Sequence, residues 1–174
     1  MHSKAFYIEL RAKYQPLKIR LIFVLESPPL NGTYFYDPSG RTTEPLFSAM
    51  MKVIGQSPAT KEDGLIRFAH QGFFLLNATY QPVNHMKNNR QRNEAILTDL
   101  AELIQDLTST IRNQRLKIVL VKANICRLLE EPLISAGFNI INNGTVVPFP
   151  SHGHQTKFHQ AIKKLFTQNR IGSS

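Results

Sequence analysis

Four short apolar runs divide the chain, at residues 19–25, 73–76, 117–121 and 138–141. Each run has the length of a strand, and none shows the strict alternation of a strand with one face in water. Strands that are buried on both faces have this pattern, and they occur mainly in parallel sheets covered by helices. We therefore expect four buried parallel strands.

The segments around these runs have apolar residues every three or four positions, the period of an amphipathic helix. The longest such segment begins at Asn93, a helix-capping residue type, and continues to Ile111 as a single helix. Gly55 and Pro132 mark two helix ends, because glycine is common just after a helix and proline disfavours helical backbone before it. The expected helices cover residues 5–13, 42–54, 59–70, 93–111, 124–131 and 155–167.

Strands that alternate with helices predict an α/β fold, here a three-layer α/β/α sandwich around a central four-stranded parallel sheet. With no internal repeat and no long linker, residues 1–174 read as a single domain. Ligand sites in such folds lie at the carboxyl ends of the strands. The loops to inspect therefore begin at Glu26, at Asn77 and after residue 141.

The charge of the chain changes this picture by suggesting a partner. Lysine and arginine outnumber aspartate and glutamate by 21 to 12, which gives a net charge of +9. Residues 64–93 and 132–174 contain no acidic side chain at all, whereas ordinary protein surfaces mix both signs. Such an excess favours a polyanionic partner, and we expect DNA, single- or double-stranded, rather than a membrane.

Cysteine usage limits the chemistry. Cys126 is the single cysteine, so the chain can form no internal disulfide and no cysteine-ligated iron–sulfur cluster. We expect no metal and no organic cofactor. No apolar run approaches the roughly 20 residues that span a bilayer, and no signal peptide is evident, which predicts a cytoplasmic protein, here expected to be a monomer.

The three strand-end loops resemble motifs of the uracil-DNA glycosylase superfamily. The segment 25–29 (LESPP) resembles its first motif, in the form with glutamate before a small residue and proline. The segment 72–77 (GFFLLN) resembles its second strand, whose terminal asparagine reads the flipped base. The segment 148–154 (PFPSHGH) resembles the third motif, which grips DNA. The resemblance covers residues 19–165 and implies the superfamily fold with a base-binding pocket at these loops.

The resemblance implies a role for each substrate-binding residue. An enzyme that acts on a base flips it out of the stack and reads its Watson–Crick edge, which the amide of Asn77 can do as donor and acceptor. Phe35 is the candidate for stacking on the base, and Ser27 and Pro28 would line the same pocket.

The catalytic candidates are Glu26 and His152. Breaking an N-glycosidic bond develops positive charge on the sugar and negative charge on the base. Glu26 would stabilise the cation or position water, and His152 would donate to the developing anion, a role that His154 could also fill.

Two groups of residues are candidates for gripping the DNA backbone. Ser151 and His154 lead into the last expected helix, which carries Lys157, and a helix N-terminus attracts phosphate. Lys87, Arg90 and Arg92 lie among asparagines after the second strand and resemble a phosphate-tracking loop.

Departures from the best-known branch leave alternatives open. That branch has aspartate where Ser27 stands, tyrosine where Pro29 stands, histidine where Phe149 stands and leucine near Gly153. The leading hypothesis is a monofunctional DNA glycosylase that removes uracil or another deaminated or damaged base by hydrolysis. The alternatives are a nucleic-acid-binding module of the same fold that has lost catalysis, and a nucleotide-processing enzyme, against which the lack of a glycine-rich phosphate loop counts.

Overall fold

A computed structural model describes residues 2–31, 33–111 and 115–172 of the chain. Within these residues four parallel strands form one sheet in the order β2-β1-β3-β4, which confirms the expected α/β fold. The strands are β1 (Leu21–Leu25), β2 (Phe73–Asn77), β3 (Lys117–Leu120) and β4 (Asn139–Ile140). β1 and β2 are buried along their whole length, as the absence of alternation in their sequences predicts.

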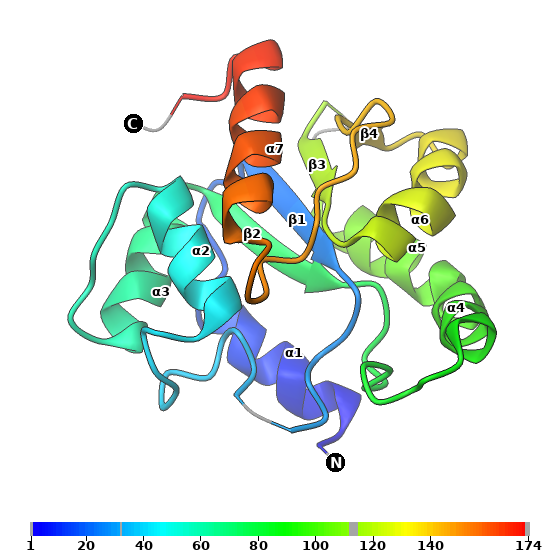
Figure 1. Ribbon diagram of the computed structural model, residues 1–174, viewed down its shortest axis with the longest axis horizontal. Coiled ribbons are helices and arrows are strands. Elements are labelled where there is room, and N and C mark those ends of the chain that lie inside the picture. Colours follow the sequence, from blue (N-terminus) through cyan, green and yellow to red (C-terminus); the bar gives the residue numbers. More distant parts are fainter. Residues whose placement is uncertain (1, 32, 112–114, 173–174) are drawn as a thin grey trace.

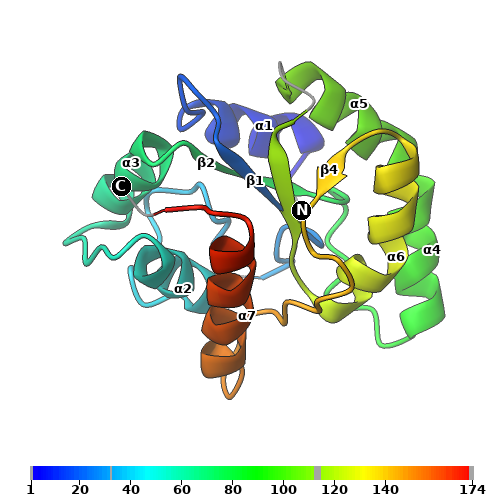
Figure 2. The same cartoon turned by 90° about the horizontal axis from the view of Figure 1, so that it is seen from above.

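The helices of the described residues cover both faces of this sheet (Figures 1 and 2). α2, α3 and α7 lie on one side and α1, α4, α5 and α6 on the other. Their bounds are α1 (Lys4–Ala12), α2 (Pro45–Val53), α3 (Lys61–His70), α4 (Asn89–Thr98), α5 (Leu100–Thr110), α6 (Ala123–Ser135) and α7 (Gln155–Gln168).

Successive residues of β2 show how the two layers are held. The ring of Phe73 meets Phe68 of α3 and Phe166 of α7, with centroids 5.8 Å and 5.9 Å away. The next ring, Phe74, lies on the other face, 5.5 Å from the guanidinium carbon of Arg11 in α1. Because neighbouring side chains of a strand point to opposite faces, one strand contributes aromatic rings to both helical layers.

The prediction of one helix from Asn93 to Ile111 is wrong. Asn88 caps α4 instead, its Oδ1 accepting from the Arg90 N–H at 2.8 Å, and the helical path breaks at Asp99. The carboxylate of Asp99 accepts a hydrogen bond from the hydroxyl of Thr79, just after β2. A short acidic side chain engaged in this way competes with helical backbone, and the partner lies too far along the chain for periodicity to reveal it.

The predicted end before Pro132 is also wrong, because α6 continues to Ser135. Proline removes one helical N–H, a cost of about 3 kcal/mol in a helix interior. Leu129 and Leu133 flank it and are fully buried, and the carbonyl of Pro132 accepts from the Ala136 N–H at 3.0 Å. Tertiary packing of the apolar face therefore outweighs the local preference.

The loop after β1 contacts the free edge of strand β2. β2 is an edge strand, and the N–H of Leu75 donates to the hydroxyl of Tyr36 at 2.7 Å. Tyr36 is fully buried, and this burial raises the pKa of its hydroxyl. The loop thus satisfies an edge donor and at the same time crosses the carboxyl ends of the strands, where it forms one side of the site.

Candidate functional site

A cavity of about 590 Å³ opens where β1 and β2 end. Leu25 and Asn77 are paired in the parallel register, so the residues that follow them emerge side by side. The residues that line the cavity come mostly from the strand-end loops in which the sequence predicts a site. It is formed by Leu25, Glu26, Ser27, Pro28, Pro29, Asn31, Thr33, Tyr34, Phe35, Arg41, Thr43, Glu44, Pro45, Leu46, Phe47, Leu75, Asn77, Asn84, Lys122 and Phe149.

Asn77 contributes a hydrogen-bonding group without a partner. The residue is only 4% exposed, and its Oδ1 is buried with no hydrogen-bond partner among the described residues. A buried amide oxygen without a partner is costly, so such an atom in a cavity wall is a candidate for contacting a ligand. The group that fits it is an N–H donor, such as the ring N–H of a nucleobase.

Glu26 is 5% exposed and has both carboxylate oxygens engaged. Lys122 donates from Nζ to Oε2 in an ion pair, and Asn124 donates from Nδ2 to Oε1 at 2.6 Å. Both partners follow β3, about a hundred residues away in sequence, and the sequence-based prediction missed them. The signal was present, because Lys122 comes directly after the third apolar run and therefore at a strand's carboxyl end.

The backbone of Lys122 is strained. Its φ of 88° and ψ of 134° lie in a region that residues with a side chain rarely adopt. The conformation is held from both sides, since the Lys122 N–H donates to the Val147 carbonyl at 2.8 Å and its own carbonyl accepts from the Cys126 N–H at 3.0 Å. Strain of this kind costs roughly 1–3 kcal/mol and gathers at functional sites. It directs a lysine side chain that is 28% exposed toward Glu26 at the cavity wall.

Phe35 forms part of an aromatic wall of the cavity. The residue is 5% exposed, and its ring lies 5.3 Å from that of Phe68 and 6.1 Å from that of Phe47. Tyr34 and Tyr36 on either side of it are buried as well. Phe35 is therefore held in place by its neighbours, and the residue lines the cavity.

A second ion pair, Lys61 with Glu44, fixes this loop. Nζ of Lys61 donates to the Tyr34 carbonyl at 2.8 Å and to Glu44 Oε2 at 2.7 Å. The other oxygen of Glu44 accepts from the Arg41 N–H at 2.8 Å. Burial lowers the pKa of Lys61, an effect that the nearby Glu44 carboxylate opposes. This network, also missed from the sequence, sets the position of the wall opposite β3.

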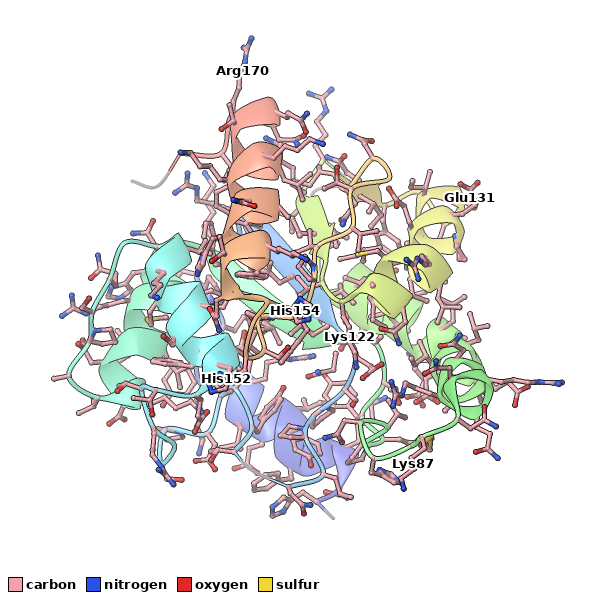
Figure 3. The ribbon with its side chains drawn as sticks, viewed as in Figure 1. Lys87, Lys122, Glu131, His152, His154 and Arg170 are labelled. Carbon is pink, nitrogen blue, oxygen red and sulfur yellow. The ribbon has the colours of Figure 1, made fainter. Side chains whose placement is uncertain are left out.

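The third predicted loop reaches the site through Phe149, which lines the cavity. Ser151, His152 and His154 lie just before or at the N-terminal end of α7, and Figure 3 shows both histidines there. His152, His154 and Lys157 are exposed to solvent, and none of these four residues lines the cavity. The structure thus brings Glu26, Ser27, Pro28, Phe35 and Asn77 together, with His152 outside the group.

The predicted phosphate-tracking loop is mostly helical. Arg90 and Arg92 belong to the first turns of α4, where Arg90 pairs with Glu94 at 2.8 Å and Arg92 donates to the Met86 carbonyl. Lys87 precedes the helix, in the loop after β2, and points away from the centre of the molecule (Figure 3). These residues lie on the same edge of the sheet as the cavity but outside its wall.

Cys126 is buried in α6, where its thiol donates to the Leu120 carbonyl at 3.3 Å and burial raises its pKa. In the part of the chain that the structure describes, no three His, Cys, Asp or Glu side chains are grouped so that they could hold a metal ion. In the same part, no helix has the length and apolar character needed to cross a membrane.

Comparison of the chain with protein-family models, with curated proteins and with solved structures found no match. The functional argument therefore depends on the cavity and its residues. Its distinguishing features are a buried amide oxygen without a partner, an aromatic wall, and an ion pair between Glu26 and a strained lysine.

Proposed function

We propose that this protein is a DNA glycosylase that hydrolyses the N-glycosidic bond of uracil or of another deaminated or damaged base. The observation that carries the proposal is the unpartnered Oδ1 of Asn77, buried in the wall of a cavity that also contains Phe35 and Glu26. A flipped base needs a group that reads its edge and an aromatic surface that replaces the lost stacking. Asn77 and Phe35 supply these two functions.

The charge of the chain supports a nucleic-acid substrate. The net charge of +9 favours association with DNA. Pro29 lines the cavity, and the best-known branch of the superfamily that these loops resemble has a thymine-excluding tyrosine at this position. The cavity of about 590 Å³ is large for one pyrimidine, so we expect a wider range of bases than uracil.

The experiment is base release from oligonucleotides, single-stranded and duplex, that contain uracil, hypoxanthine or xanthine. Asn77→Ala removes the amide, and with it the Oδ1 that would accept a hydrogen bond from the base. We expect it to lower base release on the order of 100-fold, the size expected when a buried polar contact to substrate is lost. Asn139→Ala, at the opposite edge of the sheet, is the matched control and should leave release unchanged.

A binding module of the same fold is the second candidate, and one observation favours it. Lys122 and Asn124 each donate to one oxygen of Glu26, so the carboxylate already serves two protein donors and has fewer acceptor sites left for water. DNA binding that weakens with salt, without release of any base, would support the module and reject the glycosylase.

A further inference from the structure

The Glu26, Lys122 and Asn124 side chains bring an amine, a proton acceptor and an orienting amide together beside the cavity. A primary amine lies within hydrogen-bond reach of a carboxylate, and that carboxylate is in turn oriented by an amide at 2.6 Å. A nucleophile, its base and a third group that orients the base are the general pattern of covalent catalysis. Among nucleophilic side chains, lysine acts on carbonyl carbon and forms an imine.

The placement of the three groups suits such a reaction. Glu26 is nearly inaccessible at 5% exposed, whereas the Lys122 side chain is 28% exposed and lines the cavity of about 590 Å³. The amine is therefore the member of the pair that an entering substrate can reach. The strained backbone at Lys122 also favours a functional role, since glycine would adopt φ 88° without cost.

We propose that Lys122 is a nucleophile that forms an imine with an aldehyde in the cavity. The choice of aldehyde depends on the proposed function: base hydrolysis leaves an abasic deoxyribose, whose ring-opened form carries an aldehyde at C1′. The product of the first reaction would thus be the substrate of the second. Asn77 and Phe35 bind the base before it leaves, and Lys122 then reacts with the sugar that remains.

The step balances with the groups present. Glu26 takes one proton from the Lys122 ammonium, and the lone pair of Nζ attacks C1′, forming the C–N bond as the C=O π bond breaks. The carbonyl oxygen receives that proton, and the resulting carbinolamine loses water to give a protonated imine. One ammonium and one aldehyde therefore give one iminium and one water, without an oxidant, a reductant or a metal.

The test is reductive trapping on an oligonucleotide with a preformed abasic site, with sodium cyanoborohydride as the reductant. We expect a covalent protein–DNA adduct, detected by mass and mapped to Lys122 by peptide analysis. Lys122→Arg keeps the charge but cannot form an imine that reduces to a stable amine, so its adduct should fall to background. Glu26→Gln should slow adduct formation on the order of 100-fold through loss of the base.

The matched control is Lys13→Arg, an exposed lysine outside the cavity, which should form the adduct as well as the unmodified protein. Circular dichroism and thermal unfolding verify that each variant is folded. Absence of an adduct with the unmodified protein, or an undiminished adduct with Lys122→Arg, would overturn the proposal. Because the abasic site is preformed, an adduct without base release rejects only the glycosylase, and base release without an adduct rejects only the lysine nucleophile.

Discussion

Two lysine–carboxylate pairs flank the cavity, and they differ in which partner is buried. In the Lys61–Glu44 pair the lysine side chain is 0% exposed and the glutamate 23%. In the Lys122–Glu26 pair the glutamate is 5% exposed and the lysine 28%. In the first pair the Lys61 ammonium points into the protein, where it also donates a hydrogen bond to the Tyr34 carbonyl. In the second pair Lys122 lines the cavity.

The backbone separates the two pairs further. Lys61 begins α3 in ordinary helical geometry, after Thr60 has capped the helix, whereas Lys122 has a positive φ before α6. The same two functional groups therefore serve different purposes: one pair stabilises the wall of a site, and the other supplies its reactive groups. The variants that follow should separate these two roles.

Glu44→Ala should produce the largest change in stability. It leaves the buried ammonium of Lys61 without its carboxylate, and removing one partner of a buried pair costs on the order of 3 kcal/mol. Burial already lowers the pKa of Lys61, and loss of Glu44 would lower it further. Between that folded pKa and the unfolded value of 10.5 the unfolded chain binds more protons, so the free energy of unfolding should rise with pH.

Urea unfolding at about pH 7 and about pH 9 measures this effect. The deficit of Glu44→Ala relative to the unmodified protein should be smaller at the higher pH, and an equal deficit at both would contradict the role given to Lys61. Glu102→Ala, which breaks an exposed pair with Lys4, is the control and should change stability by less than about 0.5 kcal/mol.

Lys122→Gly should change stability much less. Relief of roughly 1–3 kcal/mol of backbone strain offsets much of the cost of leaving Glu26 with Asn124 alone. Imine trapping should be lost, because the variant has no amine at this position. The sharpest comparison is with Lys122→Ala, which loses the same ion pair but keeps the positive φ and should be less stable than the glycine variant by about 1 kcal/mol.

The relative stability of Lys122→Gly and Lys122→Ala tests the strain, because a glycine normally makes a protein less stable than an alanine at the same position. Urea unfolding of both variants measures it, and an alanine variant more stable than the glycine variant would reject strain at Lys122. The double variant Lys122→Gly with Glu26→Gln removes the unpaired charge as well, and it should recover stability relative to Lys122→Gly.

Arg90→Gln should have the smallest effect on folding. Its pair with Glu94 is exposed, with side chains 87% and 59% accessible, so the free energy of unfolding should change by less than about 0.5 kcal/mol. If Arg90 contacts a phosphate, DNA affinity should fall and the slope of its salt dependence should decrease by about 1. Fluorescence titration at several salt concentrations measures the DNA affinity and its salt dependence. An unchanged slope would show that Arg90 does not contact a phosphate.

Local patterns in the sequence predicted the sheet and the edge of the sheet at which the cavity lies. Unbroken apolar runs predict buried parallel strands, and the polar residues that follow the first two of them, Glu26 and Asn77, therefore lie at the same edge of a parallel sheet. The helix boundaries were harder to predict from the sequence, because at Asp99 and Pro132 contacts with distant residues outweigh the local preference for or against helix.

Only the tertiary structure determines which side chains of the candidate site contact one another. The sequence places Glu26 and Lys122 at the carboxyl ends of two strands, but it does not show that they pair with each other or with Asn124. Their contact depends on β1 and β3 being neighbours in the sheet. It likewise does not reveal that Asn77 Oδ1 lacks a partner, or that Lys122 has a positive φ. Periodicity reports which face of an element is buried, whereas ion pairing, satisfied hydrogen bonds and backbone strain arise from groups that only the packed sheet brings together.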